Sequence, residues 1–546
     1  MSDLRTTVLS WISDDPDPRT RNELSLLMAT QQWDELDDRF AGRLQFGTAG
    51  LRGALGGGPN RMNRATVTRA AAGLAAYVNA HGGGRVVVGF DARHDSDMFA
   101  IDTVEVMRGA GLGAFLLPRP VPTPVLAYAI LRLGCAAGVM VTASHNPAAD
   151  NGYKVYLGDG SQIVPPSDAE ISAHMDAVGR LTDVPRAQGW TVVGDDLVDA
   201  YIAALVGQSL TTARDVSVAY TPLHGVGRDV LLPTFRRAGF ALPAVVSQQG
   251  SPDPDFPTVP FPNPEEPGAM DLAVALGGAT DIVIANDPDA DRCCVAVGSR
   301  VLTGDELGAL LADHVLRNTN GSDRLVVTTI VSSTLLRRMA AAHGVHYAET
   351  LTGFKWIVRA NPPGTRFVFG YEEALGYCIG AVRGPGVVRD KDGISAALAV
   401  AELAADLKAQ GRTLLDRLDE LARQHGLHAT SQWSVRVSEL DEIEAAMTAL
   451  RAAAPATLGG HPVARTVDLL SDATGLPPTD GITFWLGRAD NPYGRVVVRP
   501  SGTEPKLKAY LEVVVPVTST VAAARSQADP ALAAIKVSLQ EITGLH

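Results

Sequence analysis

Three aspartates at alternate positions form a candidate metal site: Asp287, Asp289 and Asp291. They closely follow the apolar run 280–285, which is typical of a buried strand. Carboxylates spaced by two residues in a loop can converge on a hard divalent cation. An EF-hand is excluded, because its sixth position should be glycine and is Arg292, and its twelfth should be glutamate and is Gly298. The alternative is a solvated acidic turn, but acids clustered at the carboxyl end of a strand favour the metal site.

A candidate nucleophile lies in the segment 142–147 (TASHNP), which follows another apolar run. Ser144 could attack a substrate or carry a phosphoryl group, since a hydroxyl at the end of a strand faces the ligand side of an α/β sheet. The alternative is a turn in which Ser144 or Asn146 caps a helix. A serine hydrolase is excluded, because the flanks lack G-x-S-x-G and the adjacent His145 is poorly placed to be the base.

A basic segment near the C-terminus, 499–506 (RPSGTEPK), fits a phosphate group. It offers an arginine for bidentate hydrogen bonds, two hydroxyls and a glycine that exposes backbone N–H groups. The acid and bases of residues 499–508 leave a local charge of +2 in an acidic protein. A surface turn is the alternative interpretation. No Walker A loop with Lys-Ser/Thr is present in the sequence.

Two further polar segments are weaker signals. Glu372 and Glu373 could accept hydrogen bonds from sugar hydroxyls, or they could be ordinary solvated carboxylates. The segment 352–355 (TGFK) is a similar junction of small and polar residues.

These residues follow a recurring unit of a short β-branched run, a polar loop and a helical periodicity. The runs 85–90, 215–220 and 324–330 alternate with a second set, 136–141, 280–285 and 365–370. Continuous apolar runs of this length predict strands buried on both faces by helices. The pair recurs at roughly 110–140 residues, which predicts three related α/β domains in series.

The C-terminal part of the chain has a different pattern. Segments 433–438, 481–487 and 494–500 are predicted strands of a smaller antiparallel or mixed sheet, between helices near 439–453 and 519–543. We therefore expect four domains: 1–210, 211–304, 305–425 and 426–546. The proline-rich stretch 251–267 is expected to be a loop within the second of them.

The composition limits the class of protein. A chain of 546 residues with 46% hydrophobic residues is long enough for three to four globular domains. A net charge of −13 argues against a nucleic-acid partner. The absence of a signal peptide, of an 18-residue apolar run and of CxxC pairs among the four cysteines predicts a cytoplasmic protein that does not enter a membrane.

The serine, metal, sugar and phosphate segments occur in the order found in the α-D-phosphohexomutase superfamily, which the chain resembles along nearly its whole length. Segments 46–53 (FGTAGLRG), 221–227 (TPLHGVG) and 351–357 (LTGFKWI) resemble the subgroup of phosphoglucomutase-2-like and phosphopentomutase enzymes. The resemblance implies three related α/β domains with mixed sheets sandwiched by helices. It also implies a smaller C-terminal α+β domain, and a central cleft among the four.

The resemblance also implies roles for individual residues. The catalytic group would be phosphorylated Ser144, His145 and Lys154 as candidate acid and base, and Arg52. The metal ligands would be Ser144, Asp287, Asp289 and Asp291, with Mg²⁺ as the ion. The substrate would contact Arg93, Arg292, Thr352, Gly353, Lys355, Glu372, Glu373, Arg499, Ser501, Gly502, Thr503 and Lys506.

The implied reaction interconverts the 1-phosphate and 6-phosphate of a hexose, glucose or mannose, through a hexose 1,6-bisphosphate. One departure concerns the sugar segment, where many hexomutases have serine and this chain has Ala374. A phosphopentomutase or a sugar-1,6-bisphosphate synthase therefore remains an alternative. A binding protein with a decayed centre is disfavoured, because every expected acid, base and ligand is present. We expect a monomer or a homodimer.

Overall fold

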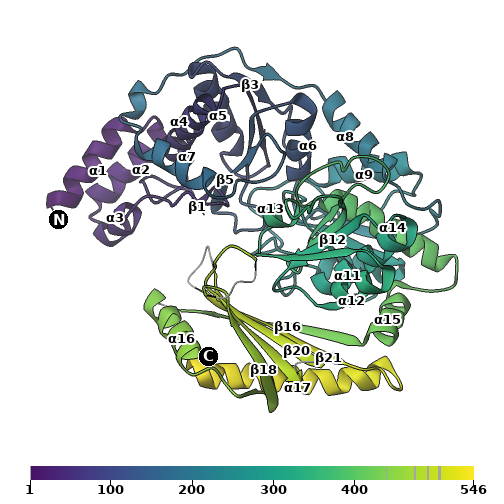
Figure 1. Ribbon diagram of the computed structural model, residues 1–546. Helices are drawn as coiled ribbons and strands as arrows, with labels where there is room; N and C mark the ends of the chain where they lie inside the picture. The colour runs from purple at the N-terminus through teal and green to yellow at the C-terminus, as the bar shows by residue number, and fades with distance from the viewer. Residues whose placement is uncertain (1, 438, 472–474, 489–490, 502–505, 546) are drawn as a thin grey trace. The chain divides into compact units, whose positions relative to one another are not determined.

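The computed structural model describes residues 2–437, 439–471, 475–488, 491–501 and 506–545 (Figure 1). The chain forms two compact units. Unit 1 comprises Met1–Leu302 and the returning segment Gly376–Ala409. Unit 2 comprises Thr303–Leu375 and Gln410–His546. The domain boundaries expected from the sequence stay a prediction; the contacts group residues 376–409 with the first two sheets rather than with the third.

Three short helices precede the first sheet: α1 (Ser2–Asp14), α2 (Pro18–Ala29) and α3 (Trp33–Phe40). Pro18 begins α2, and the side chain of Asp17 caps it by accepting the N–H of Arg19 at 2.9 Å. Val8, Leu24 and Leu36 are fully buried and form a small core between the helices.

The first sheet of unit 1 has the strand order β1-β5-β4-β2-β3-β6. The strands are β1 (Leu51–Ala54), β2 (Arg85–Phe90), β3 (Gly113–Leu116), β4 (Ala137–Val141), β5 (Asp150–Leu157) and β6 (Thr191–Val192). Strand β2 is parallel to β3 and β4, whereas β5 runs antiparallel to β4 and β1. The sheet is therefore mixed.

Helices cover both faces of this sheet (Figure 1). They are α4 (Arg64–Ala80), α5 (Ser96–Gly109), α6 (Thr123–Leu133) and α7 (Ser167–Asp176). Val86, Val88 and Phe90 of β2 belong to the core that α4 and α5 share, and α6 packs on β2 and β4. Strand β4 is buried at every position, as the apolar run predicts.

The second sheet of unit 1 has the order β11-β10-β9-β7-β8. Its strands are β7 (Val218–Thr221), β8 (Ala244–Val245), β9 (Ile282–Asn286), β10 (Cys293–Val297) and β11 (Arg300–Val301). The helices around it are α8 (Asp196–Gly207), α9 (Arg228–Ala238), α10 (Asp271–Leu276) and, from the returning segment, α14 (Gly393–Lys408), which follows β15 (Gly376–Ile379). Helix α14 packs on β9 and β10 and is buried at most of its positions.

In unit 2, strands β13 (His346–Thr350), β12 (Arg324–Thr329) and β14 (Arg366–Glu372) lie side by side and parallel. The helices that pack with them are α11 (Gly304–Asn318), α12 (Leu335–His343), α13 (Phe354–Ile357) and α15 (Leu414–His425). A capping box between Thr303 and Glu306 begins α11, whose first turn also carries Asp305.

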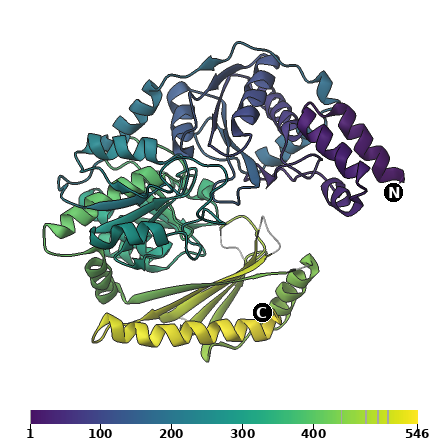
Figure 2. The ribbon, with the colours of Figure 1, turned by 180° about the vertical axis from the view of Figure 1, so that it is seen from behind.

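The second sheet of unit 2 is antiparallel, in the order β16-β21-β20-β19-β18-β17. Its strands are β16 (Leu427–Arg436), β17 (Thr457–Leu458), β18 (His461–Asp468), β19 (Ile482–Arg488), β20 (Asn491–Pro500) and β21 (Lys506–Val515). Helix α17 (Val521–Thr543) runs along one face, beside α16 (Leu440–Ala452) (Figures 1 and 2). The expected fold class, with its mixed sheets sandwiched by helices and a smaller α+β C-terminal part, is confirmed.

The carboxylate of Glu512 on β21 connects the two sheets of unit 2. It accepts hydrogen bonds from Ser333 Oγ at 2.7 Å and from the N–H of Thr334 at 2.8 Å, and it lies 2.9 Å from His428 Nδ1. Burial acts to raise the pKa of Glu512, but the hydrogen bond from His428 and the charges of His428 and Arg495 outweigh it and lower the pKa to about 2.

We expect Glu512→Gln to lower the free energy of unfolding by about 2–3 kcal/mol at pH 7, because it removes a buried carboxylate whose folded pKa lies below its unfolded value of about 4.3. The stabilisation is present above about pH 4.3 and is lost as the pH falls through 2. Urea unfolding of both proteins should therefore show a difference that shrinks below pH 4.3. The control is Glu541→Gln, at an exposed position on α17. Equal losses in the two variants would contradict the expectation.

Candidate functional site

Two loops of unit 1 bring Ser144 and the three aspartates together. The serine segment follows β4 and the aspartate segment follows β9, so each continues from the carboxyl end of a buried strand. Ser144 Oγ donates a hydrogen bond to Asp287 Oδ2 at 2.8 Å, although the two residues are 143 positions apart in the chain. Ser144 is buried and has a φ of 52°, an uncommon value for a residue other than glycine.

Oxygen atoms of Asp287, Asp289 and Asp291 lie within 4.8 Å of one another, and all three side chains are buried. The turn between β9 and β10 produces this convergence, with the N–H of Ala290 bonded to the carbonyl of Asp287 at 2.8 Å. The Oδ1 atoms of Asp289 and Asp291 are buried and meet no hydrogen-bond donor among the residues that the structure describes. Hard oxygen donors with unused lone pairs are what a divalent cation requires.

The carboxylates and lysines of this cluster shift the pKa values of the three aspartates. Burial and the carboxylates of Asp289 and Asp291 raise the pKa of Asp287. Burial acts in the same direction on Asp289, but the Lys154 ammonium outweighs it and the pKa of Asp289 lies below its ordinary value. Lys154 and Lys391 lower the pKa of Asp291 against burial and the charge of Asp289. Lys154 and Lys391 therefore favour the ionised forms of Asp289 and Asp291, and a cation bound at the cluster would favour the ionised form of Asp287 in the same way.

Lys154 lies on β5, next to β4 in the sheet. Its Nζ donates to Asp289 Oδ2 at 2.7 Å and to Asp291 Oδ2 at 2.9 Å. His145 Nδ1 is 3.3 Å from Ser144 Oγ. Burial and the nearby positive charges lower the pKa of His145 well below its ordinary value, so the ring is neutral at pH 7. Both candidate acid–base residues therefore lie at the serine–aspartate cluster.

The predicted arginines occupy different positions. Arg52 on β1 donates to Asn146 Oδ1 at 3.0 Å, so it lies beside the serine segment. Arg292 Nε lies 3.9 Å from Asp287 Oδ2 and from Asp291 Oδ1. Arg93 donates to backbone carbonyls of the serine segment, and its predicted contact with a substrate phosphate stays a prediction.

Unit 2 holds the other predicted residues in two groups. Thr352, Gly353 and Lys355 follow β13, and Glu372 ends β14. These two strands flank β12 in parallel, so their carboxyl ends lie at one edge of the sheet. Glu373 Oε2 accepts a hydrogen bond from Ser332 Oγ at 3.2 Å.

The second group lies in the antiparallel sheet. Arg499 is near the end of β20 and Lys506 begins β21. The N–H of Ser501 donates to the carbonyl of Lys506 at 2.8 Å, which closes the connection between the two strands. Gly502 and Thr503 lie outside the described residues.

Four family descriptions match the chain in order. They are phosphoglucomutase/phosphomannomutase alpha/beta/alpha domain I (residues 43–181), domain II (199–300), domain III (303–425) and the C-terminal domain (486–528). A probable phosphomannomutase of Haemophilus influenzae is 45% identical over 464 residues, which cover 83% of this chain and 93% of that protein. The chain belongs to the phosphoglucomutase/phosphomannomutase family. It is therefore an enzyme, an isomerase that moves phosphate within a sugar.

Other relatives of this mutase carry different names. The phosphoribomutase of Saccharomyces cerevisiae is 34% identical over 94% of this chain and 93% of its own. The human phosphopentomutase is 34% identical over 93% of this chain and 90% of its own. The crystal structure of a putative phosphomannomutase from Thermus thermophilus superposes with a TM-score of 0.71 at 25% identity, over 92% of this chain and 99% of that one.

The structure adds one residue that the sequence analysis missed. Lys391 Nζ lies 3.3 Å from Asp291 Oδ2, on the segment between β15 and α14. Its only local signal is its place between Asp390 and Asp392, and Asp392 caps α14. A lysine between two acids ahead of a helix is common on protein surfaces, so only the fold shows that it faces the aspartate cluster of the mutase.

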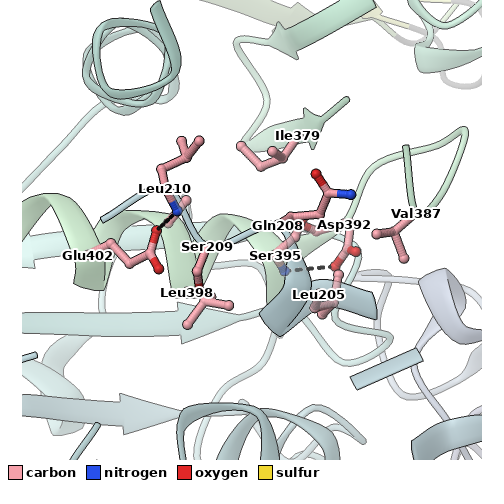
Figure 3. Close-up of a pocket in the computed structure, with 11 residues that line it drawn as sticks. Leu205, Gln208, Ser209, Leu210, Ile379, Val387, Asp392, Ser395, Leu398 and Glu402 are labelled. Atoms are coloured by element: carbon pink, nitrogen blue, oxygen red, sulfur yellow. Dashed lines mark hydrogen bonds between the residues drawn. The ribbon is translucent and has the colours of Figure 1, made fainter. Parts of the chain in front are cut away.

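A small cavity in unit 1 lies between α8 and α14 (Figure 3). Its volume is about 20 Å³, which is room for a water molecule and not for a sugar phosphate. Leu205 and Leu398 line it, and the N–H of Leu210 donates to Glu402 beside it at 3.0 Å. This space belongs to the packing of the helices. Within the described parts of the chain, none of the helices combines the length and apolar character needed to cross a bilayer.

Proposed function

We propose that this mutase interconverts hexose 1-phosphate and hexose 6-phosphate, with glucose or mannose as the sugar, through phosphorylated Ser144 and a hexose 1,6-bisphosphate. One observation carries the proposal. The hydroxyl of Ser144 is buried and hydrogen-bonded at 2.8 Å to a carboxylate of a three-aspartate cluster. A serine in that position is placed to exchange a phosphoryl group beside a bound cation.

The donor set of Asp287, Asp289 and Asp291 supports Mg²⁺, because the ligands are all hard oxygens. When bound there, the ion supplies positive charge that offsets the charge of the transferring phosphoryl group. The family and this donor set make the centre a metal site; the identity of the ion and the bisphosphate are part of the proposal.

The chain's own residues would perform the transfer as follows. The bond between phosphorus and Ser144 Oγ breaks as a bond forms to a sugar hydroxyl oxygen. The neutral His145 ring takes the proton of that hydroxyl, and Ser144 Oγ gains a proton, with the Lys154 ammonium as the candidate acid. The bisphosphate then presents its other phosphate, whose phosphoryl group moves to Ser144 Oγ. The serine hydroxyl returns its proton to the acid that supplied it, and the released sugar oxygen takes the proton held by His145. Arg52 and Arg292 would balance negative charge during both transfers.

Unit 2 would bind the rest of the substrate. We propose that Glu372, Glu373 and the segment 352–355 contact the sugar, and that Arg499, Ser501, Gly502, Thr503 and Lys506 bind the phosphate that is not transferred. An arginine near the end of one strand and a lysine at the start of the next suit a dianion. The cleft among four domains, the cytoplasmic location and the monomeric or homodimeric state stay predictions.

A second candidate function is a phosphopentomutase, with a sugar-1,6-bisphosphate synthase as a variant. The observation in its favour is the set of relatives named phosphoribomutase or phosphopentomutase, which are 33–35% identical over at least 93% of this chain. Ala374 points the same way, because alanine offers no hydroxyl to a hexose.

The experiment compares kcat/KM for the 1-phosphates of glucose, mannose and ribose, with Mg²⁺ and a trace of glucose 1,6-bisphosphate. We expect a hexose to exceed ribose by at least about tenfold, or about 1.4 kcal/mol in transition-state binding. The Ala374→Ser variant should raise the hexose-to-ribose ratio by about threefold or more, because it restores one hydrogen bond. A preference for ribose would establish the second function. Release of bisphosphate with a phosphoryl donor would indicate the synthase.

A further inference from the structure

The proline-rich segment 251–267 has no role in the proposed reaction, yet it reaches the serine segment through Arg93. Phe256, from this segment, is buried and has a φ of 46°. The guanidinium carbon of Arg93 lies 4.8 Å from the centre of the Phe256 ring, the geometry of a cation–π contact. Positive φ at a bulky residue is a backbone outlier, and such strain persists only where the surroundings enforce it.

Arg93 determines the shape of the serine segment. Its guanidinium donates to the carbonyl oxygens of Ser144 at 2.7 Å, Asn146 at 2.5 Å, Pro147 at 2.7 Å and Asp150 at 3.1 Å. These carbonyls come from the turn that carries the Ser144 hydroxyl toward Asp287. One buried guanidinium therefore holds the backbone at the reacting residue and along the turn that follows it.

The Phe256 ring covers a buried charge that water would otherwise solvate. The segment that carries the ring is itself fixed at several points. Asp255 Oδ1 lies 2.7 Å from His94 Nε2, and Thr258 Oγ1 lies 2.8 Å from His224 Nε2. The ring of Phe256 also meets the ring of His224 edge to face, with centres 6.4 Å apart.

The segment also connects to the aspartate loop. The N–H of Asp253 donates to the carbonyl of His224 at 3.0 Å. The N–H of Val226, two residues after His224, donates to the carbonyl of Pro288 at 2.8 Å. Pro288 stands between two of the aspartates. The residues with positive φ in this region, glycine excluded, are Asp95, Ser144, Leu223, His224, Phe256 and Ala290. Backbone strain therefore occurs at several residues that connect the serine segment to the aspartate loop.

We propose that Phe256 is a positioning residue: its ring covers Arg93 and thereby holds the serine segment in the shape that directs Ser144 Oγ at the aspartate cluster. The expected effect on kcat rests on the proposed function. The expected effect on the shape of the serine segment rests on the hydrogen bonds of Arg93. Without the ring, Arg93 gains access to water and its bonds to the carbonyls weaken. Misplacement of a reacting group by about 1 Å costs up to about 100-fold in rate.

The test uses full-length Phe256→Ala and Phe256→Leu. We expect kcat to fall by about tenfold or more in the alanine variant and by less in the leucine variant, with KM changed less than about twofold. Amide hydrogen exchange should rise in residues 142–150 and stay at the wild-type level in β12, which lies in unit 2. The matched control is Phe261→Ala, because Phe261 lies in the same segment and is 49% exposed.

Wild-type kcat and wild-type exchange of residues 142–150 in Phe256→Ala would overturn the proposal. Raised exchange throughout the chain would also overturn it, because it indicates a general packing role. If the alanine variant does not fold, wild-type values in the leucine variant have the same meaning. If the wild-type protein lacks mutase activity, the proposed function fails, whereas the exchange measurement still tests the contact between Phe256 and Arg93.

Discussion

Ser144→Ala is expected to lose about 10⁵-fold in kcat with glucose 1-phosphate while the protein stays folded. Removal of a nucleophile from a catalytic unit has effects of this size, because no neighbouring group can replace the covalent step. In this chain the hydroxyl has one carboxylate partner, Asp287, and the side chain is buried. Alanine keeps the Cβ and the turn, so folding should change little.

The measurement has two parts. Turnover is assayed with excess glucose 1,6-bisphosphate, so that loss of the activator cannot imitate loss of the nucleophile. Intact mass is recorded after incubation with the bisphosphate, and the wild type, but not Ser144→Ala, should gain the mass of one phosphoryl group. Ser519→Ala, at an exposed position, is the control and should keep both properties. Turnover by Ser144→Ala at the wild-type rate would disprove the phosphoserine mechanism.

Asp289→Asn is expected to abolish tight binding of Mg²⁺ and to lower kcat at least about 100-fold, since changes at a metal ligand exceed the effects of its hydrogen-bond partners. Asp289 Oδ2 also accepts hydrogen bonds from Lys154 at 2.7 Å and from Thr123 Oγ1 at 2.6 Å. An amide retains the shape of the site but removes one of the negative charges that the cation would neutralise.

Calorimetric titration of Mg²⁺ into the apoprotein measures the affinity directly. Dialysis of the wild type against a chelator should lower turnover to a similar extent, and added Mg²⁺ should restore it. Asp271→Asn is the matched control, because Asp271 is an exposed aspartate at the start of α10. Full turnover after chelation, with no cation detected in the protein, would remove the metal from the mechanism.

Much of the site and of the fold could be predicted from residues that are close together in the sequence. A buried strand followed by alternating aspartates predicts convergent carboxylates, because both the strand end and the turn depend on neighbouring residues alone. The structure brings Asp287, Asp289 and Asp291 together in that way. The prediction of related α/β units is also confirmed. It too depended on local sequence, because continuous apolar runs require helices on both faces of a sheet. Because the segments occur in the order found in the family, the sequence also predicted the reaction.

The sequence did not indicate the partners that come from distant elements. Lys391 meets Asp291 because residues 376–409 return to unit 1, and that return depends on the packing of α14 against β9 and β10. The contact of Arg93 with phosphate stays a prediction, and the sequence did not indicate that its guanidinium donates to the carbonyls of Ser144, Asn146, Pro147 and Asp150. Which atoms a guanidinium meets depends on the turn beside it.

The chemical inventory of this protein can be read from its amino-acid sequence: a serine, alternating aspartates, a basic segment suited to phosphate and the strands that precede them. Each is encoded within a few residues, where spacing and hydropathy suffice. The three-dimensional structure was needed to show that Ser144 faces Asp287, 143 positions away, and that Phe256 covers Arg93. Such contacts form because packed sheets and helices bring loops together, and that packing depends on the whole chain rather than on any one segment.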